Sequence, residues 1–441
     1  IIGFASKINL SRSIEQTIVE RLTLRSWRRV LQNTDDPRRR IQRFRDCRQV
    51  SPDRADKTSM DRQSLPPDSE VFSIAMNESL GIEAAELEAR ADWHFTKREF
   101  RDALACQLQA VAIRQRAHDV TGAGNGAQNA GLLYFLLGHH EDAIRAYAEA
   151  LESRTSTDDF RGQAVTLARM AEVYQHIGRH AQAVQLLEQS LDLLSRAGTS
   201  EDIGTALNNI AVSYRELGEW DKAMRCYERS LENRRQTGDI EGLAATLHNL
   251  GVLYSDQSHD DHARKLLEEA RGLRETMDDM QGVGQTTLRL GMLHEKHGDF
   301  PAAIAAYERA LTLARRADVQ SKDDEAAALL NLADVHANQG NIERALALLG
   351  DAERLFNETG MTTGVAMAQY GRGSTLAAAG RMSEALAWFE AARSHFLRLN
   401  DRPRLISTFI AMGTLLSRTE RHRQAREAFS SALSSPVPDG S

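Results

Sequence analysis

Few residues in this chain have the type and spacing that chemistry requires, and the nearest candidates are two histidine pairs. The segment 294–297 reads His-Glu-Lys-His, one residue short of the H-E-x-x-H motif of zinc proteases. Its histidines therefore lack the i, i+4 spacing that places two ligands on one helical face. His259 and His262 enclose two aspartates, a pattern that suits a solvated helix start better than a metal site. Neither pair predicts a metal centre.

Other catalytic patterns lack their usual context. The glycines at 122, 124 and 126 imitate a phosphate-binding loop, but no strand precedes them and no Gly-Lys-Ser/Thr follows, so we expect an inter-helix turn there. No Ser/His/Asp or Cys/His set occurs in a recognisable catalytic context. Cys106 and Cys226 fall next to positions of helix packing, as structural thiols do. The sequence thus predicts no enzyme, no cofactor and no metal ion.

Composition favours a long helical protein of the cytoplasm. The 441 residues are 41% hydrophobic and 27% charged, and they include only 8 prolines. No run of 18 or more apolar residues is present, so we predict no membrane span. Cys47, Cys106 and Cys226 lie far apart, which suits a reducing compartment rather than a disulfide framework.

The first part of the chain differs from the rest in charge. Residues 1–65 carry 15 Lys/Arg against 8 Asp/Glu, whereas the remainder is acidic and the whole chain has a net charge of −7. We predict a basic, disordered arm and linker over residues 1–78 and a disordered tail over 434–441. The arm is either a solvated tail or, through Arg38–Arg40, a patch for nucleic acid or an anionic surface. The acidic body predicts no nucleic-acid binding.

Two methionines suggest a different start for the working protein. The chain begins with isoleucine, and its first methionines are Met60 and Met76. One hypothesis is that the working protein begins at one of these two residues.

Residues 82–433 are organised by an internal repeat. An alanine in the phrase A-x-x-x-[Y/F/L]-x-x-[A/S] recurs at intervals of 40 residues, with one interval of 42. These marker alanines are Ala103, Ala143, Ala183, Ala223, Ala263, Ala303, Ala345, Ala385 and Ala425. With the alanine numbered as position 20 of its repeat, position 8 is Gly or Ala, position 15 is usually Gly, and position 24 is usually large and apolar.

Two amphipathic helices per repeat follow from this spacing. Positions 4, 7, 8 and 11 share one face of a helix, and positions 20, 24 and 27 share one face of a second helix. Glycine at position 15 is expected to end the first helix in the left-handed conformation. Small residues at positions 8 and 20 would let the helices approach, with the side chain of position 24 filling the space beside them. A single pair cannot bury its face, so neighbouring pairs must stack around a continuous core.

The pattern resembles the tetratricopeptide repeat (TPR) family. The match is carried by Ala-Val-Ser-Tyr-Arg-Glu-Leu-Gly at 211–218, Asp-Lys-Ala-Met-Arg-Cys-Tyr-Glu-Arg-Ser at 221–230 and Asn-Leu-Gly-Val-Leu-Tyr at 249–254. The period exceeds the family's usual length of about 34 residues. It is similar to the variant of Pins/LGN-type polarity adaptors and of the sensor arms of bacterial signalling ATPases. The resemblance implies an all-α, right-handed superhelix of about nine antiparallel helix pairs over residues 82–433.

Function on such a scaffold is expected on the face that packing does not use. Positions 2, 6, 9 and 13 of the first helix point away from the packed stripe and, by the TPR resemblance, line a concave groove. Position 6 is polar in six consecutive repeats, with Asn129, Arg169, Asn209, Asn249, Arg289 and Asn331. An Asn amide both donates and accepts, which matches an extended peptide backbone, and Arg can hold a carboxylate bidentately.

Neighbouring positions complete the predicted partner-binding set with apolar and charged residues. They are Glu172, Val212, Val252, Asp256, Met292, Lys296 and Asp334. In TPR proteins asparagine at position 6 commonly holds the backbone of the ligand, and the resemblance carries this role to Asn129, Asn209, Asn249 and Asn331. The alternative is that these asparagines bond to neighbouring helices and hold the stack together.

The sequence thus predicts a non-enzymatic protein–protein interaction scaffold that binds a peptide or a helix of a partner in its groove. An alternative of another class is the sensor arm of a larger signalling regulator, which a P-loop encoded upstream in the same reading frame would favour. An enzyme built on the solenoid is a further alternative, without a catalytic constellation to support it. Self-association is another. It would use the end repeats, which look like caps because His94 occupies a packing position and Glu420 replaces the turn glycine.

Overall fold

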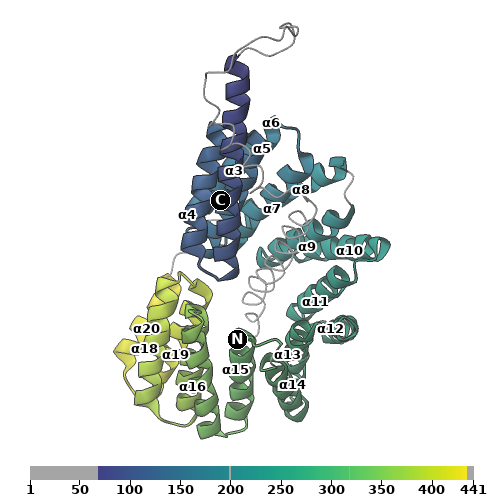
Figure 1. Cartoon of the computed structure of the whole chain (residues 1–441). Helices are drawn as coiled ribbons and strands as arrows, with labels where there is room; N and C mark the ends of the chain where they lie inside the picture. Colours follow the sequence, from purple (N-terminus) through teal and green to yellow (C-terminus); the bar gives the residue numbers. More distant parts are fainter. Residues whose placement is uncertain (1–67, 198–199, 317, 435–441) are drawn as a thin grey trace, which may run out of the picture. The chain divides into compact units, whose positions relative to one another are not determined.

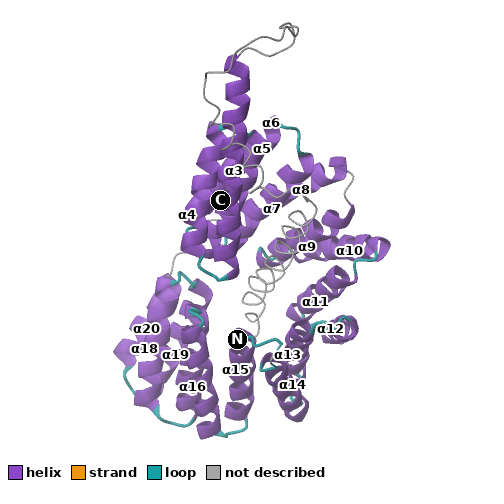
Figure 2. Cartoon of the chain, viewed as in Figure 1, coloured by secondary structure: helices purple, strands orange, loops and turns teal. Residues whose placement is uncertain are grey.

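The described part of the protein consists of α-helices joined by short turns. The computed structural model describes residues 68–197, 200–316 and 318–434, and Figure 2 shows no strand among them. The eighteen helices of these residues are α3 (Asp68–Thr96), α4 (Phe100–Arg116), α5 (Val120–Leu136), α6 (His140–Ser156), α7 (Phe160–His176), α8 (His180–Ala197), α9 (Ser200–Glu216), α10 (Trp220–Thr237), α11 (Ile240–Asp256), α12 (Asp260–Thr276), α13 (Met280–Lys296), α14 (Phe300–Ala314), α15 (Lys322–Asn338), α16 (Ile342–Glu358), α17 (Thr362–Ala378), α18 (Met382–Arg398), α19 (Arg402–Arg418) and α20 (His422–Ser434). The predicted all-α architecture is confirmed.

Consecutive helices pair to give nine repeats, from repeat 1 (α3 and α4) to repeat 9 (α19 and α20). Figure 1 labels most of these helices. The repeats belong to two compact units. The N-terminal unit ends at Asn233 and the C-terminal unit begins at Arg234, so the boundary lies inside α10. Outside the pair that contains this boundary, the two helices of a repeat pack more extensively with each other than with the next repeat. The predicted solenoid of nine helix pairs is therefore confirmed.

The turn within each repeat follows the predicted left-handed geometry. Glycines at position 15 have positive φ, for example 78° at Gly138 and 76° at Gly218, where a side chain would be strained. Three repeats reach the same geometry without glycine, at Arg98, Ser258 and Glu420, with φ of 60°, 61° and 59°. Tertiary packing of the two helices therefore imposes this turn even where the residue resists it by about 1–2 kcal/mol.

The two helices of a repeat approach through small residues, as the spacing predicts. Eight of the nine marker alanines are 0% exposed, and Ala425 is 5% exposed. At position 8 of repeat 2, a Cβ on Gly131 would lie 2.7 Å from the ring of Tyr147 at position 24. The same holds in repeat 8, where a Cβ on Gly373 would lie 2.7 Å from the Phe389 ring. Glycine at position 8 thus makes room for an aromatic ring at position 24.

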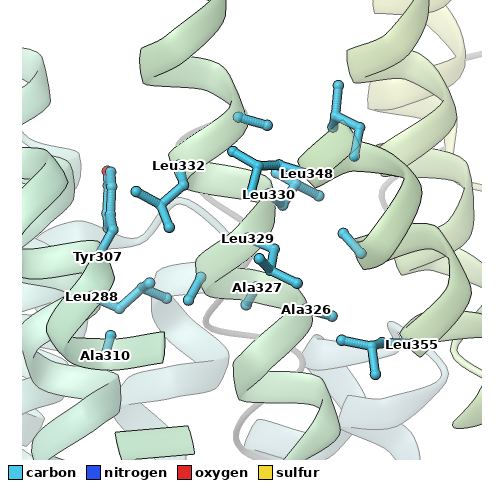
Figure 3. Packing of buried hydrophobic residues seen from close by; sticks show 14 of the residues in the cluster. Leu288, Tyr307, Ala310, Ala326, Ala327, Leu329, Leu330, Leu332, Leu348 and Leu355 are labelled. Atoms are coloured by element: carbon cyan, nitrogen blue, oxygen red, sulfur yellow. The ribbon is translucent and has the colours of Figure 1, made fainter. Parts of the chain in front are cut away.

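Stacking of neighbouring repeats buries a continuous apolar layer in the C-terminal unit. Figure 3 shows leucines of α15, among them Leu329 and Leu330, between Leu288 of α13 on one side and Leu348 of α16 on the other. Tyr307 of α14 joins the same cluster and is fully buried. Burial of each such side chain contributes about 1.5–3 kcal/mol, so the shared core holds successive repeats together.

Several junctions between repeats contain a buried arginine. Arg154, near the end of α6, donates from Nη1 to the carbonyl of Gly162 at 2.6 Å and to the Thr166 hydroxyl at 2.7 Å, both in α7. Asp159 is the N-cap of α7 and accepts from the Gly162 N–H at 2.9 Å. A Cβ on Gly162 would lie 2.8 Å from Cδ of Arg154, so the junction requires glycine there. We call this arrangement a polar junction.

The polar junction recurs after α12, and the sequence analysis overlooked it. Arg274 donates to the Gly282 carbonyl and to the Thr286 hydroxyl, each at 2.8 Å, while Asp279 caps α13. Burial lowers the pKa of Arg274, and Asp279 opposes that shift. The sequence signal is R-x4-D-x2-G, present at residues 114–122, 154–162, 234–242 and 274–282.

Other junctions are apolar at the same position. Phe356 is 1% exposed in repeat 7, and its ring occupies the space that a Cβ on Gly364 would need. Phe396 in repeat 8 packs with Ala366, Ala392 and Leu405. A ring thus replaces the guanidinium in repeats 7 and 8. Met361 precedes α17 where the polar junctions have aspartate, whereas Asp401 caps α19 but Arg404 stands where they have glycine.

One predicted boundary and one predicted turn differ from the structure. Helix α3 begins at Asp68, so residues 68–78, assigned above to the arm and linker, are helical; Pro66 and Pro67 directly precede this start, where proline is tolerated. Residues 1–67, with the basic arm and Met60, and residues 435–441 lie outside the described part of the chain.

The glycines at 122–126 are not a turn, because they lie inside α5. They lack side chains where α5 packs closely on Val111 and Ser153.

Candidate functional site

The first helices of successive repeats line the inner side of each unit. In the N-terminal unit α5 contacts α7, and in the C-terminal unit contacts run from α11 to α13, α15, α17 and α19. Second helices of adjacent repeats make at most weaker contacts within the described residues. Because the closer side of a curved stack is its inner side, the predicted partner-binding residues, all on first helices, belong to two inner faces, one per unit.

The N-terminal inner face carries Asn129, Arg169, Glu172, Asn209 and Val212. The Asn129 side chain is exposed, and Asn209 is partly exposed with its carbonyl accepting from Gln175 Nε2 at 3.0 Å. Val212 is buried at 7% exposure, so it packs rather than presents an apolar surface.

An ion pair of two partly buried side chains lies on this face. Arg169 and Glu172, one turn apart on α7, form an ion pair of 2.9 Å, and both side chains are partly buried. Burial works to lower the pKa of Arg169, but Glu172 outweighs it and the pKa is raised. The guanidinium is thus permanently charged and already paired, and a ligand carboxylate would have to compete with Glu172.

The C-terminal inner face carries Asn249, Val252, Asp256, Arg289, Met292, Lys296, Asn331 and Asp334. Asn249 is partly exposed and Asp256 exposed, while Val252 is buried. Arg289 is 6% exposed, with Nη1 3.7 Å from Sδ of Met292. Asn331 is 7% exposed, and its Nδ2 donates to the Ala327 carbonyl of its own helix at 2.8 Å. The Asn331 amide is therefore engaged within α15 and does not face a ligand in this conformation.

Lys296 connects two repeats. Its Nζ lies 2.8 Å from Asp260 Oδ1 and 3.3 Å from the Ser258 hydroxyl, both at the turn of repeat 5. His297 adds a second contact, with Nε2 3.1 Å from Asp260. The ammonium of Lys296, in repeat 6, thus binds to the turn of repeat 5.

An acidic pair lies between α13 and α15. Glu295 accepts from the Tyr307 hydroxyl at 2.8 Å and from Asn338 Nδ2 at 3.5 Å. Burial raises the pKa of Glu295, against the effect of the Tyr307 hydrogen bond. Burial, together with the nearby Glu295, raises the pKa of Asp334 to about 7. Neither carboxylate forms an ion pair with a cation among the described residues. We call Glu295 and Asp334 the acidic pair.

The sequence analysis named Asp334 but missed Glu295. Position 12 carries no common residue type through the repeats, and Glu295 sits inside the His-Glu-Lys-His segment that was examined for metal binding. An acidic residue followed twelve positions later by the tyrosine of position 24 is the signal that would have found it.

The histidine segments lie at the turns of repeats 5 and 6. His294 has a side chain that is 37% exposed, with Nδ1 3.8 Å from Asp299. His259 is the N-cap of α12 and stands over the ring of Tyr254, as does His262. Cys106 and Cys226 are free thiols of intermediate exposure, and burial raises the pKa of the Cys226 thiol, which disfavours the reactive thiolate.

Stacked antiparallel helix pairs with an inner face of first helices define a helical-repeat protein. Two models of the tetratricopeptide repeat family match the chain, one over residues 162–236, 202–276, 283–358 and 364–435 and the other over residues 127–157. The matches cover more than half of the chain, and the chain belongs to the tetratricopeptide repeat family. No curated protein matches it.

Solved structures share the fold at low sequence identity. The quorum sensor NprR from B. thuringiensis, in its apo form, is 14% identical with a TM-score of 0.54, over 83% of this chain and 99% of NprR. Aspartyl phosphate phosphatase F from Bacillus subtilis is 11% identical with a TM-score of 0.51, over 86% of this chain and 95% of that chain.

A third solved structure combines such repeats with an ATPase. The STAND protein PH0952 from Pyrococcus horikoshii, which has a tetratricopeptide repeat sensor, is 15% identical with a TM-score of 0.53. The match extends over 86% of this chain and 60% of that one. At these identities all three likenesses show the fold alone. None of the helices in the described part of this chain combines the length and apolar character that crossing a membrane requires.

Proposed function

We propose that the protein is a non-enzymatic interaction scaffold that binds a peptide or a helix of a partner protein on its inner faces. The fold supports this proposal because a solenoid offers an extended surface rather than an enclosed active site. Asparagines at position 6 remain at least partly exposed on both inner faces, at Asn129, Asn209 and Asn249. Their amides suit the donors and acceptors of a peptide backbone.

The observation that carries the proposal is the acidic pair. Two carboxylates whose pKa values are raised by burial lie together between α13 and α15, without a cation from the described residues. Keeping a charge partly out of water is unfavourable unless an opposite charge compensates it. A ligand that brings a cation to this place would remove the penalty. We therefore infer that the partner contributes a Lys or Arg side chain, or a free amino terminus, between α13 and α15.

The proposed contact has a defined pH dependence. A bound cation favours the ionised carboxylates, so binding would displace the proton that Asp334 holds below pH 7. Affinity for the partner should increase as the pH rises towards about 7 and level off above it. Salt should weaken the contact, since the charges are partly exposed.

The experiment captures partners from lysate of the source cell with the full chain and compares two variants by quantitative mass spectrometry. The inner-face variant carries Asn249→Ala, Glu295→Gln and Asp334→Asn. The matched control carries Glu149→Gln, Glu228→Gln and Glu308→Gln, three exposed carboxylates on second helices. The expected result is a partner retained by the wild type and the control and lost from the inner-face variant. The affinity of that partner is then measured by calorimetry at pH 6 and pH 8.

Two outcomes would contradict the proposal. Equal retention by the inner-face variant, with an unchanged melting temperature, would move the contact to another surface. A partner that binds equally at both pH values would exclude a role for Asp334, because its protonation changes across that interval.

A second candidate function is the sensor arm of a larger signalling regulator. It is favoured by the fold shared with PH0952, whose repeats form the sensor of a signal transduction ATPase, since this chain matches 60% of that protein. A reading frame that continues this sequence into a nucleotide-binding motif would support it. A small molecule, rather than a protein, that protects the inner faces from hydrogen exchange would support it as well.

A further inference from the structure

The turn of repeat 1 brings three potential metal ligands together. His94 lies in the last turn of α3, Glu99 is the N-cap of α4, and Asp102 lies in the first turn of α4. One ligand atom from each residue lies within 4.8 Å of the other two. His94 Nδ1 is 2.7 Å from Glu99 Oε2, so the ring and the carboxylate already point toward each other. The sequence analysis predicted no metal here, because spacing alone does not join residues across this turn.

The three side chains are not committed to other partners. The Glu99 carboxylate makes no capping hydrogen bond to α4, although Glu99 is the N-cap residue. Asp102 forms no ion pair among the described residues. The nearest lysine, Lys97, places Nζ over the ring of Trp93 at 6.0 Å rather than between the carboxylates. His94 is only 24% exposed, so its position is fixed by packing on α4.

Comparison with the other repeats shows that this set is specific to repeat 1. Its residues occupy positions 11, 16 and 19, which meet in the turn of each repeat. Repeat 6 has histidine and aspartate at the first two positions, His294 and Asp299, but Ala302 at the third. Repeat 7 has His336 followed by asparagine and arginine at the other two positions. In the described turns, an imidazole therefore meets two carboxylates in repeat 1 alone.

We propose that His94, Glu99 and Asp102 bind a divalent transition-metal ion of the Zn²⁺ class. One imidazole nitrogen and two carboxylate oxygens are a donor set that Zn²⁺ accepts, with water completing the tetrahedron. Binding replaces the hydrogen bond between His94 and Glu99 by two metal–ligand bonds, and the imidazole binds in its neutral form. The ion links the end of α3 to the start of α4 and so stabilises the degenerate first repeat.

Trp93 provides a local reporter of this site. Its ring centroid lies 4.9 Å from that of His94, and 55% of its surface is exposed. A paramagnetic ion such as Co²⁺ or Cu²⁺ bound to His94 will quench Trp93 fluorescence. Replacing the other tryptophans in a variant with Trp27→Phe, Trp220→Phe and Trp388→Phe leaves Trp93 as the sole emitter.

The test titrates the untagged, chelator-treated full chain with Zn²⁺ in a calorimeter and with Co²⁺ in the single-tryptophan variant. We expect one saturable equivalent and quenching of Trp93. His94→Ala, Glu99→Gln and Asp102→Asn should each weaken binding by about tenfold or more. The matched control is His294→Ala with Asp299→Asn, which removes the two-ligand counterpart in repeat 6 and should leave the titration unchanged.

A second control removes the other histidine-rich turn, with His259→Ala and His262→Ala, and should also leave Trp93 quenching unchanged.

The proposal is overturned if the wild type shows no saturable binding, or if the three ligand variants bind as tightly as the wild type. It is equally overturned if quenching disappears with the repeat 5 or repeat 6 control. Circular dichroism of each variant shows whether repeat 1 remains folded, and Glu99→Gln, the mildest change, keeps the test valid if His94→Ala does not.

Discussion

The polar junctions and the acidic pair both place charge out of water, but among the described residues only the junctions supply an opposite charge. At the junction after α12, Arg274 meets a carbonyl, a hydroxyl and the carboxylate of Asp279. At the acidic pair, Glu295 receives hydrogen bonds but no cation from the described residues, and burial raises the pKa of Asp334 to about 7. A buried charge that the chain satisfies points to a structural role, whereas one that it leaves uncompensated points to a binding role.

The polar junctions also differ from the apolar junctions by several coordinated residues. An aspartate follows the arginine five residues later in all four polar junctions, and a threonine follows twelve residues later in three of them, as with Asp279 and Thr286 after Arg274. After Arg114 the twelfth residue is Gly126. Where Phe356 replaces the arginine, Met361 and Ala368 occupy these places, although Gly364 is kept. The junction of repeat 7 therefore lacks the partners that a buried guanidinium needs, and placing an arginine there alone should fail.

The largest expected effect comes from moving the arginine into an apolar junction. Phe356→Arg removes a fully buried ring and leaves a guanidinium without an aspartate or a threonine. We expect a loss of about 3–5 kcal/mol in the stability of repeats 7 and 8. Urea unfolding, with amide hydrogen exchange of α16 and α17 to localise the change, measures it.

Supplying the missing partners tests the coordinated set. The triple variant Phe356→Arg, Met361→Asp and Ala368→Thr rebuilds a polar junction around the existing Gly364 and should recover part of the lost stability. Phe356→Leu is the control, since Leu194 occupies this position in repeat 3. If the triple variant is no more stable than Phe356→Arg, the junction residues do not act together.

A smaller loss is expected when a polar junction loses its arginine. Arg274→Leu removes hydrogen bonds to the Gly282 carbonyl and the Thr286 hydroxyl, worth about 1.5–3 kcal/mol for bonds from a charged group. The variant should retain partner binding, because Arg274 lies at a junction and not on an inner face. Arg264→Ala is the control, since its ion pair with Asp261 is exposed and should contribute less than about 1 kcal/mol. Equal losses in the two variants would remove the distinction between junction and surface arginines.

The sequence was sufficient for the fold because the repeat spacing reports local geometry. The marker alanines, the small residue at position 8 and the turn glycine such as Gly138 all act within one helix pair, where periodicity is a direct record of packing. The junction of Arg274 with Gly282 and Thr286 instead joins two repeats, and the role of its residue spacing becomes clear only once the pairs are stacked. The glycines of α5 were assigned to a turn because a glycine run marks either a turn or a close approach of helices, and only packing separates the two.

The candidate site was less predictable than the fold for a related reason. Helical spacing places Asp334 and Asn331 on first helices, but it does not tell which amide bonds to its own helix or which carboxylate loses water. The structure shows that Asn331 is engaged with Ala327 and that Asp334 lies beside Glu295. Both results depend on the burial that neighbouring repeats create, a quantity without a local sequence signal.

Asp334 is also expected to make the stability of the protein depend on pH. Its pKa in the folded protein, about 7, lies above the ordinary carboxyl value, so between about pH 4 and pH 7 the folded state binds a proton that the unfolded state has lost. The contribution of Asp334 to stability therefore decreases as the pH rises through this interval and is constant above it. Asp334→Asn removes the carboxylate, so the stability difference between variant and wild type should shift in favour of the variant from pH 4 to pH 8. Urea midpoints across this range measure the difference, with Asp256→Asn, an exposed carboxylate of the same inner face, as the control. A difference that does not change with pH would show that Asp334 is ionised throughout and that the acidic pair carries no uncompensated charge for a partner to neutralise.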